Sequence, residues 1–112
     1  MTPQQFRQLA LDLPASTEGR HMGHADFRVA NKIYATLGPD ESWAMVKLNP
    51  EQQAAIIAED APAFEPIAGG WGLRGATKIH LCRAAEERVV RVLLLSWRNT
   101  VPQKLLKLLD QG

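Results

Sequence analysis

The first half of the chain alternates apolar and polar residues in three short segments, residues 25–30, 32–37 and 43–48. Alternation of period two is typical of a strand with one buried face. Ala30 and Asn31 lie between the first two segments and suit a tight hairpin turn, because asparagine tolerates a positive φ. Residues 38–42 predict a second turn. Two further strands are expected, one on either side of these three, at residues 16–23 and 76–81. The short connections predict antiparallel neighbours.

Four other segments repeat their apolar residues with the period of a helix. They run from the N-terminus to Pro14, over 51–60, over 84–97 and over 102–110. The first two begin with the same signal, a cap residue, a proline and then a glutamine at the third helical position. These triplets are Thr2, Pro3 and Gln5, and Asn49, Pro50 and Gln52. Such a pattern predicts a capping box at each helix start.

The order of these elements predicts an α+β fold, with an antiparallel β-sheet and helices packed on one face. An N-terminal helix precedes a four-strand meander, which is followed by a helix, a fifth strand and the C-terminal helices. The chain of 112 residues fits a single domain, residues 1–112, and its 46% of apolar residues suffice for one core.

Composition narrows the class of protein. No apolar run approaches the roughly 20 residues that span a bilayer, and the N-terminus does not resemble a signal peptide. The single cysteine, Cys82, excludes an internal disulfide. We therefore expect a soluble, cytoplasmic protein without a membrane partner. Cys82 belongs to a predicted strand, where a buried, unreactive thiol is expected.

Charge is distributed unevenly along the chain. Residues 1–66 carry five Lys/Arg and nine Asp/Glu, a net charge of −4, and residues 67–112 carry eight and three, a net charge of +5. A basic half is typical of a surface that binds a polyanion. Solvated helix faces around a core explain the same distribution.

Two of the three histidines, His21 and His24, stand three residues apart in the segment HMGH. On a strand such residues point to opposite faces, and a zinc site needs a third and a fourth ligand. We therefore expect a hydrogen-bonded hairpin pair, with no metal and no cofactor. The nearby Glu18 and Asp26 would serve acid–base chemistry or, as we prefer, a salt bridge across a hairpin. The chain has no G-x-S-x-G elbow, and the expectation is a protein that is not an enzyme.

Residues 69–75, GGWGLRG, contain the spacing G-x-G-x-x-G. In a dinucleotide-binding fold this motif follows a strand and begins a helix, whereas here a proline-bearing stretch precedes it and a strand follows. We reject a nucleotide site on that criterion. Two interpretations of this predicted loop are left. Either Trp71 folds onto the core, or the loop presents an exposed indole beside Arg74 and Lys78, which suits a phosphate backbone with base stacking.

Three segments together resemble one known family. The segments that carry this similarity are GRHMGHADFRVANKIYATL, WAMVKLNPEQQ and PAFEPIAGGWGLRGATKIHL, followed by SWRNTVPQKLL. In the order and spacing of these segments, the chain is similar to the MmcQ/YjbR family of small bacterial proteins. The hairpin turn, often glycine-rich in that family, is Ala30-Asn31 here. The resemblance implies a frataxin/CyaY-like fold and a DNA-binding protein with a double-wing arrangement of β-hairpins. It implies no catalytic residues. The similarity to frataxin also suggests iron handling. Frataxins use an acidic surface for this, whereas the first helix here carries Asp12 as its only acid, which argues against that role.

These observations lead to three hypotheses. The first is DNA binding through a basic hairpin and the glycine-rich loop. Its candidate contacts are Arg28, Lys32, Trp71, Arg74 and Lys78, which Lys104 and Lys107 would extend. The second is a non-catalytic module that binds an unidentified protein partner or a small ligand, with a pocket near the loop and Trp71 or Trp97 at its rim. The third is an enzyme or metal protein that uses His21 and His24.

Overall fold

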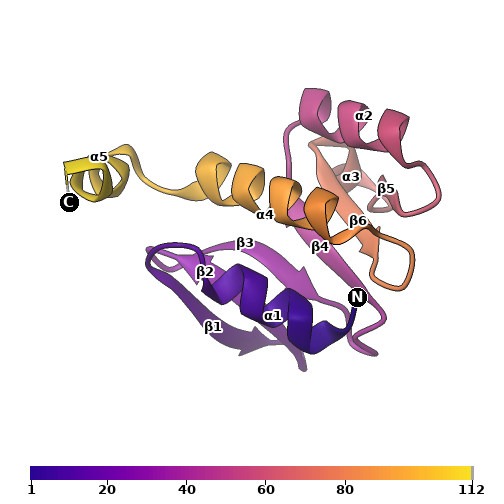
Figure 1. The fold of residues 1–112 in the computed structure, drawn as a ribbon, viewed down its shortest axis with the longest axis horizontal. Helices are drawn as coiled ribbons and strands as arrows, with labels where there is room; N and C mark the ends of the chain where they lie inside the picture. Colours follow the sequence, from indigo (N-terminus) through magenta and orange to yellow (C-terminus); the bar gives the residue numbers. More distant parts are fainter. Residues whose placement is uncertain (112) are drawn as a thin grey trace.

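The computed structural model describes residues 1–111 as one six-stranded antiparallel sheet with five helices (Figure 1). The strands are β1 (Ser16–His21), β2 (His24–Val29), β3 (Lys32–Leu37), β4 (Trp43–Lys47), β5 (Phe64–Pro66) and β6 (Ala76–His80). The helices are α1 (Pro3–Leu11), α2 (Pro50–Glu59), α3 (Gly70–Leu73), α4 (Glu86–Thr100) and α5 (Gln103–Gln111). The predicted α+β class and the order of its elements are confirmed.

The meander β1–β2–β3–β4 is built on two tight turns. Ala30 and Asn31 both have positive φ, as do Met22 and Gly23 between β1 and β2. Positive φ at both central residues is the signature of a type I′ turn, whose twist matches that of the strands it joins. Strand β6 then inserts between β4 and β5, so that the sheet order is β1-β2-β3-β4-β6-β5.

Helices α1 and α2 begin as predicted. In each, the cap side chain accepts a hydrogen bond from the third helical amide, and the glutamine side chain accepts one from the cap amide. Helix α1 ends at Leu11, three residues before Pro14, where Asp12 forms the C-cap. None of the helices in the described chain is long and apolar enough to cross a membrane.

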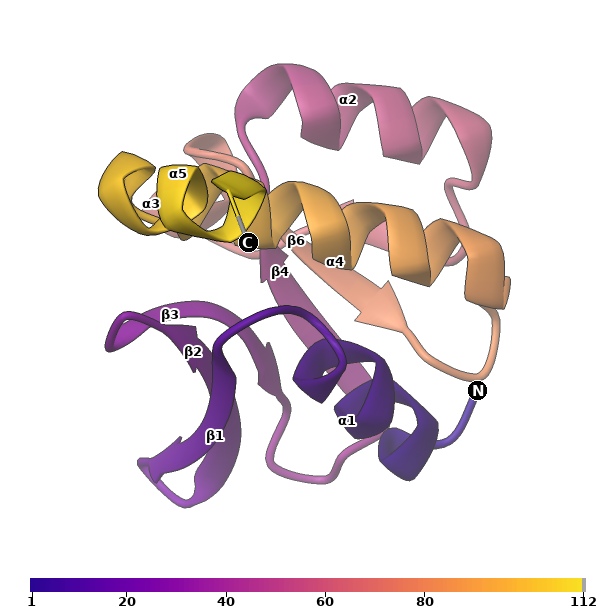
Figure 2. The ribbon, with the colours of Figure 1, turned by 60° about the vertical axis from the view of Figure 1, so that its left-hand side comes forward.

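The core lies between one face of the sheet and helices α1 and α4 (Figure 2). Phe6 of α1 meets Phe27 of β2 edge to face, with 5.8 Å between ring centroids. Tyr34 is buried and donates its hydroxyl to the carbonyl of Ala10 at 2.9 Å. Trp97 of α4 is buried as well, so it lies at no pocket rim.

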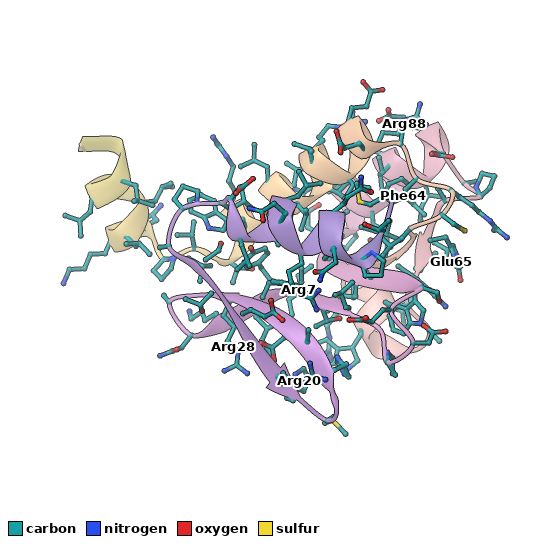
Figure 3. The ribbon with its side chains drawn as sticks, turned by 60° about the horizontal axis from the view of Figure 1, so that its bottom comes forward. Arg7, Arg20, Arg28, Phe64, Glu65 and Arg88 are labelled. Atoms are coloured by element: carbon teal, nitrogen blue, oxygen red, sulfur yellow. The ribbon has the colours of Figure 1, made fainter. Side chains whose placement is uncertain are left out.

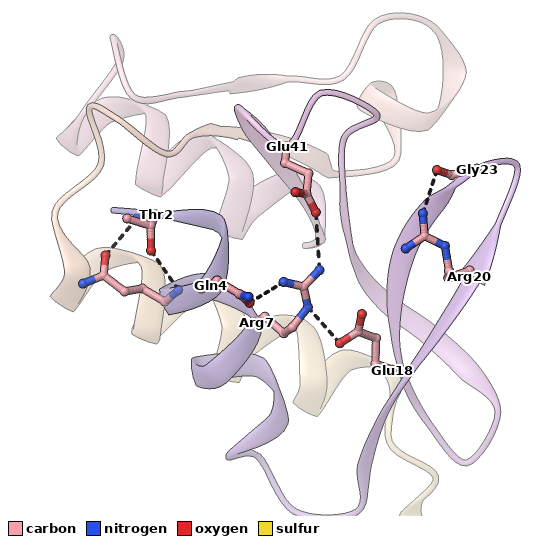
Figure 4. A network of polar contacts seen from close by, with 8 residues as sticks. Thr2, Gln4, Arg7, Glu18, Arg20, Gly23 and Glu41 are labelled. Atoms are coloured by element: carbon pink, nitrogen blue, oxygen red, sulfur yellow. Dashed lines mark hydrogen bonds and ion pairs between the residues drawn. The ribbon is translucent and has the colours of Figure 1, made fainter.

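An arginine on α1 joins the helix to the sheet edge. Arg7 donates to Glu18 of β1 at 2.9 Å and to Glu41 of the β3–β4 turn at 3.3 Å, and it also donates to Gln4 (Figure 4). Glu18 therefore pairs with α1 and not with the histidines.

The structure adds two short elements that the sequence did not predict. The segment GGWGLRG, predicted as a loop, contains the single helical turn α3. Strand β5 has three residues and ends at Pro66, which is too short for an alternating pattern to be recognised. It exists because its backbone pairs with β6, with Phe64 opposite Ile79. At the other end of the molecule, α5 extends away from the sheet (Figure 1).

Candidate binding site on the open face of the sheet

The face of the sheet opposite α1 and α4, here called the open face, carries the second set of alternating side chains. Strand pairing aligns Thr36 of β3 with Met45 of β4, and Met45 with Lys78 of β6. Trp43 and Lys47 lie two residues to either side of Met45 and therefore share its face. Large apolar groups therefore occur on a face of the sheet that neither α1 nor α4 covers.

A pocket of about 460 Å³ opens on this face. That volume is within the usual range of small-ligand sites, about 300–1,000 Å³. Its lining comes from the open face, from the β1–β2 turn and from the α3 region. The lining residues are His21, Met22, His24, Ile33, Thr36, Trp43, Met45, Lys47, Ile67, Trp71 and Ala76. The indole of Trp43 lies against Gly38, where a Cβ atom would come within 2.3 Å of the ring.

Trp71 is exposed at the edge of the pocket, with 61% of its surface accessible. The interpretation in which this indole folds onto the core is therefore wrong. Arg74 Cζ lies 5.7 Å and Lys47 Nζ 5.9 Å from the Trp71 ring centroid, within the range of cation–π contact. Neither cation forms a salt bridge with a carboxylate in the described part of the chain.

The glycines of the GGWGLRG segment hold α3 in place. A Cβ atom on Gly72 would lie 1.7 Å from the carbonyl oxygen of Ile67. Gly75 has a φ of 116°, and a Cβ there would lie 2.0 Å from the carbonyl oxygen of Leu48. The side-chain amide of Gln53 on α2 donates to the carbonyls of Gly72 and Ala76 at 3.0 Å each. The motif therefore serves close backbone packing, which fixes the position of Trp71.

A buried carboxylate orders the hairpin side of the site. Asp26 is fully buried and accepts two hydrogen bonds from Arg28, at 2.7 and 2.9 Å, and one from the ring nitrogen Nδ1 of His21 at 2.8 Å. The Arg28 hydrogen bonds, with a smaller contribution from His21, hold the pKa of Asp26 below its ordinary value despite burial. A Cβ on Gly19, opposite Asp26, would come within 2.8 Å of that carboxylate.

The two histidines lie side by side, with 4.8 Å between their ring centroids. The expectation that they point to opposite faces is wrong, because the Met22-Gly23 turn makes them direct cross-strand partners. The predicted hairpin pair exists, but its hydrogen bond runs from His21 to Asp26. In residues 1–111 no three His, Cys, Asp or Glu side chains form a grouping suited to a metal ion. Cys82, expected to be buried, is exposed.

The five residues predicted to contact DNA are not equivalent in the structure. Trp71 and Arg74 meet at the pocket edge, and Lys78 lies 4.8 Å from the ring centroid of Trp43 on the same face. Lys78 also faces Glu65 of β5, which hydrogen-bonds His80 at 2.8 Å.

Arg28 extends from the β1–β2 hairpin and lies far from Arg88 of α4 (Figure 3). The charge of Arg28 is paired with the carboxylate of Asp26. Lys32 is exposed at the β2–β3 turn and lines no part of the pocket. The hairpin side of the site is consequently less basic than its sequence suggests.

Two residues of the site, Trp43 and Lys47, were not singled out from the sequence. The signal was present in the segment WAMVKL, where Ala44, Val46 and Leu48 occupy the core face. Trp43 and Lys47 must then face outward, and a tryptophan on the outward face of a strand is a sign of a binding surface.

Comparisons with known proteins give a family and a fold. A model of the YjbR family matches residues 11–107. The crystal structure of the Deinococcus radiodurans protein DR2400, with a DUF419 domain, is similar with a TM-score of 0.71 and 18% identity, over 86% of this chain and 75% of that one. A crystal structure of a Pseudomonas syringae protein has a TM-score of 0.70 and 18% identity, over 89% and 99%. No curated protein matches the chain. At this identity the two structures show the fold alone.

Proposed function

This chain belongs to the YjbR family, and we propose that it is a non-catalytic DNA-binding protein whose open face contacts the phosphate backbone. In this proposal the β2–β3 hairpin with Lys32 and the α3 segment with Arg74 act as two wings on either side of the pocket. The protein would act on DNA in the cytoplasm of a bacterium.

One observation carries the proposal. Trp71 is exposed and lies close to two cations, Lys47 and Arg74, that have no carboxylate partner in the described chain. An accessible aromatic ring beside unpaired cations is the combination that proteins use to bind nucleic acid, because the cations neutralise phosphates and the ring stacks on a base. Arg28 contributes little to this surface, since Asp26 already holds its charge.

A second function is favoured by the pocket itself. Its size and apolar lining suit a small ligand or a side chain of a protein partner, with Trp71 at the rim. Under this alternative the cations would orient an anionic group of the ligand, and DNA would not be bound.

Fluorescence anisotropy of a labelled DNA, titrated with the protein between about 50 and 200 mM salt, tests the first function. We expect binding that weakens with salt. The double variant Lys47→Ala/Arg74→Ala should reduce the slope of log affinity against log salt by about 1.4 to 1.8, the contribution of two phosphate contacts.

The matched control removes two positive charges elsewhere. Lys104→Ala/Lys107→Ala changes the net charge equally on α5. The sequence suggested these two lysines as an extension of the basic surface, but in the structure they are exposed on α5 and line no part of the pocket. An equal loss in both double variants would attribute the binding to net charge and contradict the proposed site. No binding at the lower salt would contradict DNA binding and favour the second function.

A further inference from the structure

The pocket on the open face has two aromatic walls from different parts of the chain. Trp43 belongs to β4 and Trp71 to α3, and Met45 and Ile33 add apolar side chains to the same lining. Apolar and aromatic side chains offer no partner to a phosphate or to a sugar hydroxyl. They offer favourable contact to a flat, weakly polar ring.

Positive charge accompanies both indoles. Lys47 and Arg74 lie against the ring of Trp71, and Lys78 lies against the ring of Trp43. An occupant that matches this arrangement has a flat ring for the recess and an anionic group next to it for the cations. A nucleotide unit combines these two features, because its base is flat and its phosphate is attached close by.

Four polar side chains interrupt the apolar lining, those of His21, His24, Thr36 and Lys47. A small number of polar groups in an otherwise apolar pocket is the usual means of orienting a ligand. A base presents hydrogen-bonding groups along its edge, and a hydrocarbon side chain of a protein does not. This feature favours a base over an apolar side chain as the occupant.

A double helix cannot fill such a recess without local opening. In a duplex the faces of the bases are stacked on one another, and only phosphates and base edges reach the surface. A single strand exposes whole bases that can leave the stack and insert between aromatic side chains. We infer that the pocket holds one unstacked base of a single-stranded nucleic acid. This inference rests on the proposed function and specifies which form of nucleic acid the site selects.

The test compares three labelled probes of about 12 nucleotides, a length that a small domain can cover. They are a thymine single strand, an abasic strand of the same length that keeps the sugar–phosphate backbone but lacks the bases, and a duplex. The first two carry the same phosphates, so that their difference measures the bases. We expect the abasic strand to bind about 5- to 150-fold more weakly than the thymine strand, the effect of losing one base–aromatic stack. We expect the duplex to bind more weakly than the thymine strand as well.

Two variants on α3 make the test specific. Trp71 and Leu73 are both exposed, by 61% and 82%, but only Trp71 lines the pocket. Trp71→Ala should lower the affinity for the thymine strand towards that for the abasic strand, because Trp43 is then the one aromatic wall left. It should change the affinity for the abasic strand less than about twofold, because the cations are kept. Leu73→Ala should leave the affinities for both strands unchanged.

The possible failures are distinguishable. Equal, salt-dependent binding of the thymine and abasic strands would overturn the base pocket and leave the DNA-binding function in place. A duplex that binds more tightly than the single strand, or a Trp71→Ala variant with unchanged affinity for the thymine strand, would overturn the inference in the same way. Absence of binding to all three probes at about 50 mM salt would overturn the proposed function and this inference together.

Discussion

Replacing Asp26 with asparagine removes a buried negative charge from the hairpin while nearly preserving the shape of the side chain. The wild-type carboxylate is fully buried, and it accepts two hydrogen bonds from Arg28 and one from His21. An asparagine oxygen can still accept one of these bonds, but its amide group presents N–H donors where the second oxygen had accepted. We expect the variant to fold with lower stability.

The magnitude follows from the contacts that are lost. A hydrogen bond to a charged group contributes about 1.5–3 kcal/mol, and a buried donor that loses its partner costs a similar amount. The side chains of the two partners are about one third exposed, at 32% for Arg28 and 39% for His21. Water can therefore replace part of the hydrogen bonding that they lose, which reduces the cost. We expect Asp26→Asn to lower the free energy of unfolding by about 2–3 kcal/mol.

The pH dependence provides a sharper check. Because the pKa of Asp26 is lowered in the folded state, its contribution is fully present above the unfolded pKa of about 3.9. That contribution is lost as the pH falls through the folded pKa. The difference in stability between wild type and Asp26→Asn should therefore be largest at about pH 6 and shrink towards pH 3 and below.

Urea unfolding followed by circular dichroism measures both effects. At about pH 6 the midpoint should fall by about 2 M with an unchanged slope. Asp12→Asn, which alters an exposed carboxylate at the end of α1, should change stability by less than about 0.5 kcal/mol. An Asp26→Asn midpoint equal to that of wild type, or a difference that is the same at both pH values, would refute the role assigned to this carboxylate.

Three further outcomes can be measured on the same purified protein. Gly72→Ala forces a Cβ atom against a backbone carbonyl and should cost about 1–3 kcal/mol in urea unfolding, whereas Gly70→Ala meets nothing within 4 Å and should change stability little. His24→Leu should be neutral or stabilising, because its Nδ1 is buried without a hydrogen-bond partner in the described chain, and a clear loss of stability would contradict this. Burial raises the pKa of Tyr34, the only tyrosine, so the absorbance titration of the folded protein should have its midpoint above pH 10. Tyr34→Phe should lower the free energy of unfolding by about 1 kcal/mol, because the hydrogen bond to Ala10 is lost.

Several parts of the site were accessible from the sequence. The segment GGWGLRG drew attention to Trp71 and Arg74, which the structure brings together at the pocket edge. The sequence could not show whether the charge of Arg28 is free to contact a phosphate. Its partner Asp26 is two residues away on the same strand, and the two pair only because the strand holds both on the open face. The contribution of Lys47 to Trp71 depends on how α3 packs beside β4, and no local pattern encodes that contact.

The sequence by itself determined the elements whose signals are local. A capping box, an alternating strand and the Ala30-Asn31 turn each depend on residues within a few positions of one another, and the structure contains all of them. Tertiary structure alone decided the pairing of the short strand β5 with β6, the contact between the two histidines and the pocket that Trp43 and Trp71 both line. The physical reason is that backbone pairing and close packing join segments distant in the chain, and they set which side chains share a face and which charges are already paired.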